Sequence, residues 1–204
     1  MGGDLETTRE LARKNILSLY NYPHDIVTAC ASGGYMLKKI YPGLFDKSSP
    51  LYSKALAVAH KTYDISEYLV KKIGLHQIQQ HLKQTPRRQV TYHDPCHLIR
   101  GQEISAEPRR LLQTVFGNDF IEMADADRCC GSGGTYGLTH PETSLTILHK
   151  KTKNILDSSA QVVATACPGC MIQIKDGLAR QENDMEVYHI LELISHRLSN
   201  EHQK

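Results

Sequence analysis

The chain has 204 residues, room for one domain or for one domain and part of a second. Hydrophobic residues make up 40% and charged residues 23%, which is typical of a globular protein and excludes a disordered one. Lys and Arg number 24 against 22 Asp and Glu, with no basic block, so we expect no nucleic-acid partner. Apolar runs such as Val162–Cys167 are far shorter than the ~20 residues of a membrane span, and the N-terminal residues lack a signal-peptide pattern.

The N-terminal part predicts a helix–strand–helix unit over residues 1–45, with its strand just before Cys30. A longer helix is expected over Leu51–Gly74, because apolar residues recur on one face and Gly74 makes a suitable C-terminal cap. Asp64, three residues before Glu67, could restart a helix within this stretch. We expect the apolar face to belong to the core, with a subunit contact as the alternative.

From residue 87 onward, four predicted strands alternate with helices. The strands are expected at Gln89–His93, Phe120–Met123, Gln161–Thr165 and Glu186–Ile190. The helices are expected at Pro108–Phe116, Pro141–Ser158, Met171–Ala179 and Leu191–Leu198. This alternation predicts an α/β fold with a doubly wound parallel sheet over residues 87–204. Residues 1–86 are expected to form a partial N-terminal α/β repeat with connecting helices.

Five of the six cysteines follow the predicted strands. In a parallel sheet the carboxyl ends of the strands lie along one edge, where open α/β folds bind their ligands. We therefore expect five thiols to converge at this edge, those of Cys96, Cys129, Cys130, Cys167 and Cys170. The sixth, Cys30, is expected to be a buried core cysteine.

Four interpretations fit such a group of thiols. They could be packed core cysteines, since free Cys is often buried. They could hold a structural zinc ion, although only Cys167 and Cys170 have the usual spacing of its ligands. The same pair, at a helix N-terminus, could exchange thiols and disulfides, which leaves the other three thiols unexplained. A polynuclear iron–sulfur cluster accounts for all five, because several irons can use more than four thiolates.

A glycine-rich run follows the adjacent pair of cysteines. Gly131, Gly133 and Gly134 would let the backbone approach a cluster closely, so that its N–H groups point at sulfide. The run does not match the dinucleotide-binding fingerprint, because Tyr136 stands where that motif has its third glycine. We therefore take these three glycines as candidate cofactor-binding residues, with a flexible loop as the alternative.

The cysteine spacing resembles a known family. The pattern is Cys96-x32-Cys129-Cys130-Gly131-x35-Cys167-x2-Cys170, and the first cysteine stands within His93-Asp94-Pro95-Cys96-His97-Leu98. It is similar to the cysteine-rich CCG domain of the heterodisulfide reductase B subunit, the glycolate oxidase iron–sulfur subunit, and subunits for lactate utilisation and anaerobic glycerol-3-phosphate oxidation. The resemblance covers roughly residues 87 to 198 and implies that the five cysteines are ligands of a non-cubane [4Fe–4S] cluster.

The N-terminal residues contain a second, incomplete copy of this pattern. The run Lys-Asn-Ile-Leu and a β-rich segment precede both Cys30 and Cys167, which therefore match each other. Gly33 stands in the place of Cys170, and no cysteine precedes Cys30. Because family members usually carry two such motifs, we expect one cluster per chain and a first repeat that is naturally short, split between subunits or truncated. Replacing Cys30 with Ser should leave the cluster intact.

The resemblance implies an iron–sulfur subunit that carries electrons between a flavoprotein dehydrogenase and a quinone, disulfide or other acceptor. The sequence has no Cys-x2-Cys-x2-Cys-x3-Cys-Pro run, so further clusters would come from a ferredoxin-like partner subunit. One alternative is cleavage of a disulfide at the cluster, for which the candidate proton donors are His93, Asp94, His97 and Tyr136. Another is a zinc-stabilised assembly module. We expect a cytoplasmic location, with membrane contact only through partner subunits.

Overall fold

The structure is a computed structural model that describes residues 3–198. Its strands are β1 (Ile26–Thr28), β2 (Thr62–Asp64), β3 (Val90–His93), β4 (Val162–Thr165) and β5 (Glu186–His189). Its α-helices are α1 (Leu5–Tyr20), α2 (Ala31–Tyr35), α3 (Tyr41–Gly43), α4 (Pro50–His60), α5 (Ile65–Tyr68), α6 (Leu75–Gln80), α7 (Cys96–Ile99), α8 (Ala106–Phe116), α9 (Tyr136–Thr139), α10 (Pro141–Asp157), α11 (Pro168–Ala179) and α12 (Ile190–Arg197). Two π-helical segments, η1 (Met36–Ile40) and η2 (Leu69–Ile73), and a 3₁₀ turn, η3 (Gly117–Asp119), complete the described elements.

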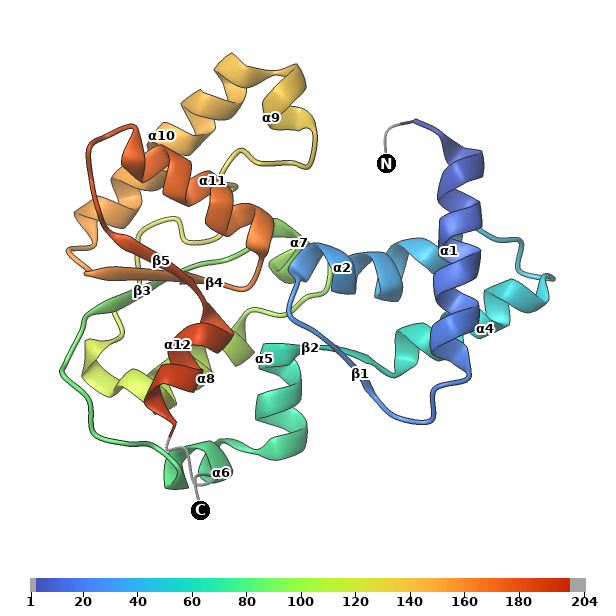
Figure 1. Cartoon of the computed structure of the whole chain (residues 1–204), viewed down its shortest axis with the longest axis horizontal. Coiled ribbons are helices and arrows are strands. Elements are labelled where there is room, and N and C mark those ends of the chain that lie inside the picture. The colour runs from blue at the N-terminus through green and yellow to red at the C-terminus, as the bar shows by residue number, and fades with distance from the viewer. Residues whose placement is uncertain (1–2, 199–204) are drawn as a thin grey trace.

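The larger sheet has the strand order β3-β4-β5 and is parallel throughout. Helices α10 and α11 cover one face of this sheet, and α8 and α12 cover the other (Figure 1). Every residue of β3 and β4 is buried, as expected of strands covered on both sides. The predicted doubly wound α/β fold is therefore confirmed.

The register of this sheet aligns the carboxyl ends of its strands. His93 at the end of β3 lies opposite Thr165 of β4, which in turn lies opposite His189 of β5. The chain segments that carry Cys96 and Cys167 begin directly after this row of residues. They therefore leave the sheet at the same edge.

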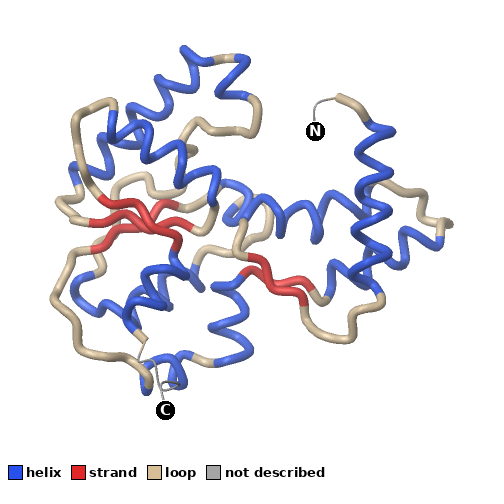
Figure 2. Tube along the Cα trace, viewed as in Figure 1, coloured by secondary structure: helices blue, strands red, loops and turns tan. Residues whose placement is uncertain are grey.

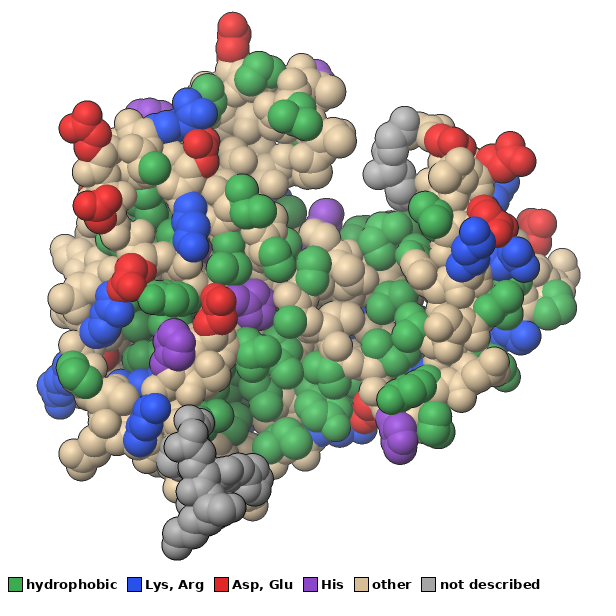
Figure 3. All heavy atoms as spheres, viewed as in Figure 1, with side chains coloured by type: hydrophobic (Ala, Val, Ile, Leu, Met, Phe, Trp, Pro, Cys, Tyr) green, Lys and Arg blue, Asp and Glu red, His purple; other side chains and the backbone are tan. Residues whose placement is uncertain are grey.

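A second, smaller sheet consists of β1 and β2, which run parallel beside α1, α2 and α4 (Figures 1 and 2). Asp4 caps the N-terminus of α1, where its side chain accepts hydrogen bonds from the backbone and hydroxyl of Thr7. A small separate core, built on Ala12, Ile16, Ala55 and Val58, holds α1 against α4. On the face seen in Figure 3, the surface is hollowed between this part and the helices α9 and α10.

The two sheets share an internal repeat, as the sequence predicts. In each, a strand leads to a cysteine that caps the next helix, and a second parallel strand ends at a polar residue that caps another. The two strand pairs also have the same register. The equivalent residues are Thr28 and Thr165, Cys30 and Cys167, and Asp64 and His189.

The strand predicted at Phe120–Met123 is wrong. The segment makes only an isolated parallel bridge, between Phe120 and Val90, supported by a hydrogen bond from the Ile121 amide to the Val90 carbonyl. Beyond it the chain leaves the register of β3, and the Glu122 carboxylate binds Arg109 on α8. The larger sheet therefore has three strands among the described residues, not four.

The single helix predicted over Leu51–Gly74 is also wrong in its middle. Helix α4 ends at His60, and β2 follows because its backbone pairs with β1. The predicted restart at Asp64 is confirmed, since the Asp64 carboxylate accepts a hydrogen bond from the Ser66 amide and caps α5. Gly74 ends the helical stretch with a φ of 90°, as its assignment as a cap requires.

A large hydrophobic core surrounds the three-stranded sheet and also takes in residues from the N-terminal part, including Val70 and Ile78. Helices α5 and α6 of the N-terminal part also pack on α8 of the C-terminal part. The division into residues 1–86 and 87–204 therefore stays a prediction. No helix within residues 3–198 is both long and apolar enough to cross a membrane.

Candidate metal centre

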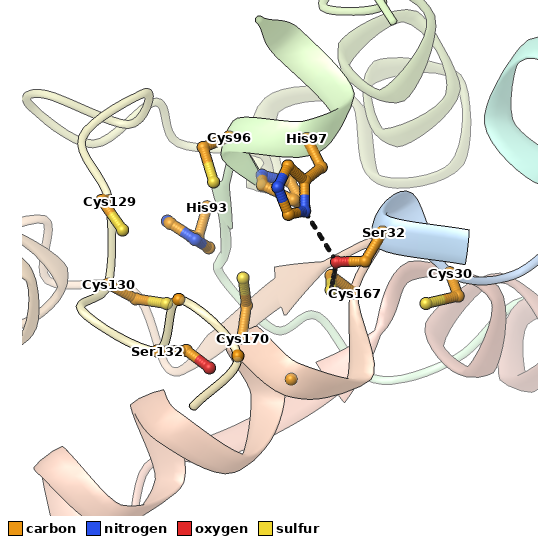
Figure 4. Close-up of a pocket in the computed structure, with 14 residues that line it drawn as sticks. Cys30, Ser32, His93, Cys96, His97, Cys129, Cys130, Ser132, Cys167 and Cys170 are labelled. Carbon is orange, nitrogen blue, oxygen red and sulfur yellow. Dashed lines mark hydrogen bonds between the residues drawn. The ribbon is translucent and has the colours of Figure 1, made fainter. Parts of the chain in front are cut away.

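A cavity of about 290 Å³ lies at the carboxyl edge of the three-stranded sheet, and all six cysteines line it (Figure 4). Cys96 begins α7 after β3, while Cys129 and Cys130 lie in the loop between α8 and α9. Cys167 caps α11, and Cys170 stands in its first turn. The predicted convergence of five thiols is confirmed, and their role as metal ligands stays a prediction.

The six thiols form a continuous chain of contacts across the cavity. In order, the contacting residues are Cys96, Cys129, Cys130, Cys170, Cys167 and Cys30. None of them forms a disulfide. Sulfur is thus the main polar atom that the cavity presents, which suits a soft metal.

The pKa values of these thiols shift in two directions, down for Cys129 and Cys167 and up for the other four. Hydrogen bonds from neighbouring thiols, above all Cys130, hold the pKa of Cys129 well below its ordinary value. Cys167 has a lowered pKa for the same reason, chiefly through Cys170. The other four thiols have raised pKa values, because each would lose its proton beside the thiolate of Cys129 or Cys167. These four are Cys30, Cys96, Cys130 and Cys170. A bound cation would allow all of them to ionise, and this donor set therefore fits a metal centre.

Cys30 lies at the cavity and not in the core, contrary to the prediction from its sequence context. It is half-buried, and its sulfur contacts that of Cys167. The Gly33 amide donates a hydrogen bond to the Cys30 Sγ at 3.4 Å, and the Ala31 amide donates one to the Ala166 carbonyl at 3.0 Å. The first bond caps α2, and the second ties the start of α2 to the segment just before α11.

His93 points into the cavity from the end of β3 (Figure 4). Its side chain is completely buried, and neither ring nitrogen has a hydrogen-bond partner. One of its nitrogens and the Sγ atoms of Cys130 and Cys170 lie within 4.8 Å of one another. Burial lowers the pKa of His93 to about 3, so that the ring is neutral and can act as a metal ligand.

The glycine-rich loop closes one side of the cavity. Gly131, Gly133 and Gly134 all have positive φ values, of 89°, 51° and 64°. A Cβ atom on Gly131 would stand 2.5 Å from the Ser144 carbonyl oxygen, so no larger residue fits there without a shift. The Gly131 amide donates a hydrogen bond to the Cys129 Sγ at 3.3 Å, which stabilises that thiolate. The last two glycines line the cavity itself.

His97 stands at the exposed rim of the cavity, between the two sheets. Its Nδ1 atom lies 2.9 Å from the hydroxyl oxygen of Ser32, and its ring stacks on Tyr35 at 5.0 Å between centroids. The same hydroxyl lies 3.6 Å from the Cys167 Sγ. Sequence reasoning misses Ser32 as a site residue, and the only signal for it is its place two residues after Cys30 in the incomplete repeat.

The remaining candidate proton donors do not line the cavity. The ring of Tyr136 stacks on His140 at 4.8 Å between centroids. Asp94 is buried, and both of its carboxylate oxygens accept hydrogen bonds from Arg109, at 2.9 and 2.6 Å. Asp94 therefore supports the segment that precedes Cys96 and is not free to transfer a proton at the cavity.

A family model described as a cysteine-rich domain (CCG) matches residues 90–175, which carry the five predicted ligands. The chain is 37% identical over 194 residues to the B subunit of the fumarate reductase (CoM/CoB) of Methanothermobacter marburgensis, covering 94% of this chain and 36% of that protein. It is 32% identical over 187 residues to lactate utilization protein A of Lysinibacillus sphaericus, covering 91% of this chain and 79% of that protein.

A third relative is the probable glycolate oxidase iron-sulfur subunit of Bacillus subtilis, with 34% identity over 194 residues, 94% of this chain and 43% of that protein. The chain thus spans less than half the length of two of these relatives and most of the length of the other. In all three the similarity extends well beyond the cysteine-rich segment, into the incomplete N-terminal repeat.

Proposed function

This chain belongs to the family of cysteine-rich CCG-domain proteins, and on that premise we propose that it is an iron–sulfur electron-transfer subunit of an oxidoreductase. The observation that carries the proposal is the set of thiols that line one cavity at the carboxyl edge of the sheet. The relatives add support, since one is named an iron-sulfur subunit and another a fumarate reductase subunit.

In this proposal the ligands are Cys96, Cys129, Cys130, Cys167 and Cys170, and the group they hold is a [4Fe–4S] cluster of the non-cubane type. The cluster would supply one-electron redox chemistry. The chain's own contribution is to hold the thiolates in place and to donate a hydrogen bond from the Gly131 amide to the Cys129 sulfur. Gly133 and Gly134, on the cavity wall, would let the backbone approach the cluster closely.

Electrons would reach the cavity from a flavoprotein dehydrogenase, directly or through a ferredoxin-like iron–sulfur subunit. The support for a multi-subunit assembly is that two of the relatives are named as subunits. The exposed His97 and the half-buried Cys30 both line the cavity, so a partner could dock on this side of it. A cytoplasmic location, with membrane contact only through partner subunits, belongs to the same proposal.

A second candidate is reduction of a disulfide substrate at the cavity. Its support is the open rim, where the Ser32 hydroxyl and the His97 ring are hydrogen-bonded to each other. The same hydroxyl lies beside the sulfur of Cys167, a thiol whose pKa is lowered. Two electrons and two protons would convert one disulfide into two thiols, with the electrons supplied through the proposed partner. Thiol release from an added disulfide by the reduced protein would favour this function over electron transfer alone.

The test is analysis of iron, zinc and acid-labile sulfide in the full chain purified without oxygen. Several irons per chain with matching sulfide, and visible absorption that bleaches on reduction, are the expected result. About one zinc per chain without sulfide would instead indicate a structural zinc site and an assembly module, and would overturn the electron-transfer proposal.

A further inference from the structure

The imidazole of His93 is buried without a hydrogen-bond partner. The side chain is 0% exposed, and both ring nitrogens lack a hydrogen bond. A neutral imidazole carries one N–H donor and one acceptor nitrogen, and buried groups of this kind are nearly always satisfied in folded proteins. The occupant of the cavity is therefore the natural partner of at least one ring nitrogen.

The surrounding protein groups do not fill this role. The carbonyl of Ala126 interacts with the ring, but one carbonyl can serve one ring nitrogen at most, and it already accepts hydrogen bonds from the Asp94 amide at 3.0 Å and the Lys151 ammonium at 3.2 Å. The Lys151 ammonium also binds the Asp125 carbonyl, at 2.6 Å. Lys151 is thus engaged by two backbone carbonyls, and no hydrogen bond joins it to the imidazole.

The geometry on the cavity side fits a metal ion. One ring nitrogen of His93 and the Sγ atoms of Cys130 and Cys170 are mutually within 4.8 Å, and all three residues are buried. Ligand atoms around one tetrahedral metal lie about 3.5 to 4 Å apart at ordinary metal–nitrogen and metal–sulfur bond lengths. A small contraction around a bound ion would bring the three atoms to these distances.

The backbone holds His93 in place for such a role. It is the last residue of β3, its neighbour across the sheet is Thr165, and the next residue, Asp94, is fixed by Arg109. A ligand on a paired strand next to a buried ion pair is more rigid than one on a loop. We propose that His93 is a nitrogen ligand of the metal centre, on the metal atom that Cys130 and Cys170 also bind.

This inference rests on the proposed metal centre but extends its ligand set beyond cysteine. A neutral imidazole leaves more positive charge on the metal than a thiolate does, and histidine ligation in [2Fe–2S] centres raises the reduction potential. His93 would therefore bias the centre toward accepting electrons. That bias would suit a cluster that takes electrons from a reduced flavin.

The test is pulsed electron paramagnetic resonance on the reduced full chain, grown with histidine labelled with ¹⁵N. We expect the strong hyperfine coupling of a directly bound nitrogen, which shifts with the label. His97→Gln should retain this coupling, because His97 lies at the rim and bonds Ser32. His93→Gln should lose it together with part of the iron. If the metal proves to be zinc, X-ray absorption at the zinc edge resolves one nitrogen among four ligands and answers the same question.

A second variant separates ligation from folding. His93→Cys offers a thiolate at the same position, so we expect the iron to be retained, the nitrogen coupling to vanish and the reduction potential to fall. A labelled wild-type protein with iron and sulfide but only weak nitrogen coupling would overturn the proposal and leave the electron-transfer function standing. So would an unchanged reduction potential in an iron-loaded His93→Cys protein. Absence of iron and sulfide would count against the proposed function itself.

Discussion

The two repeats of this chain share a backbone plan and differ in the chemistry they carry. In both, a strand that ends in Thr is followed by Ala and then by a Cys that caps a helix, after β1 in one and after β4 in the other. The C-terminal repeat adds β3, whose end carries His93, and the loop that carries Cys129 and Cys130. The comparison teaches that the strand–cysteine–helix unit positions a thiol, whereas the third strand and the long loop build a site around it.

The repeats also differ in how completely their strands are buried. Val27 in β1 is 40% exposed, whereas every residue of β4 is buried between two layers of helices. The N-terminal repeat instead contributes its helix end to the rim of the other repeat's cavity, through Cys30 and Ser32.

The largest expected effect tests whether a thiol of the C-terminal repeat and the thiol of the N-terminal repeat are equivalent in holding the metal. Cys170→Ser removes a thiol that contacts both Cys130 and Cys167, so we expect loss of nearly all iron and visible absorption. Cys30→Ser should keep its iron, because Cys30 stands at the end of the chain of thiols and contacts only Cys167 among them. Iron content per chain after anaerobic purification measures both. Iron loss in Cys30→Ser would show that the N-terminal repeat supplies a ligand.

A smaller effect is expected from breaking the ion pair behind β3, the strand that the N-terminal repeat lacks. Arg109→Met keeps most of the side-chain volume but leaves the buried Asp94 carboxylate without its cation. Removing one partner of a buried ion pair costs about 3–5 kcal/mol of unfolding free energy. The control Arg128→Ala breaks an exposed pair with Asp125 and should cost about 0–1 kcal/mol. Equal losses in denaturant unfolding would contradict the structural role of Asp94.

The smallest effect concerns the equivalent helix caps Asp64 and His189. Burial shifts their pKa values in opposite directions, so their contributions to stability change with pH in opposite directions. Burial raises the pKa of Asp64 to about 6, above its ordinary value of 3.8, so the stability it contributes is present below pH 4 and is lost as pH rises through 6. This loss amounts to about 3 kcal/mol. Burial lowers the pKa of His189 below 6.5, so its contribution is present above that pH and is lost on acidification.

Unfolding free energies of the wild type, Asp64→Asn and His189→Gln between pH 4 and 7.5 measure this contrast. Asp64→Asn should gain stability relative to the wild type as pH rises through the window from 4 to 6. His189→Gln should instead gain relative to the wild type as pH falls below 6.5. Parallel curves for the three proteins would mean that neither cap is titrated as its burial requires.

Much of the fold is predictable from the sequence because its signals are local. The run Gln161–Thr165 is apolar and β-branched, and the structure makes β4 of it. Pro141 begins α10 as its restricted φ angle favours, and Asp64 restarts a helix through its own side chain. The alternation of such elements is sufficient to predict the parallel sheet and therefore the edge at which the five cysteines meet.

Other features depend on contacts between segments distant in sequence. The strand β2 exists because β1 lies beside it, and the segment at Phe120 makes a single bridge with Val90 before Glu122 pairs with Arg109 on α8. The spacing of apolar residues in the sequence identifies neither β1 nor Arg109 as a contact of these segments. The same limit explains why the sequence predicts Cys30 in the core, since only the docking of α2 brings it to Cys167.

The sequence by itself determines which groups can bind a metal, because thiol chemistry and strand-end spacing are properties of the residues and their order. Tertiary structure decides which of these groups share a cavity, which of them ionise, and that His93 is buried there without a partner. The physical reason is that desolvation and thiol–thiol hydrogen bonding act over a few ångströms, between residues as far apart in the sequence as Cys30 and Cys167.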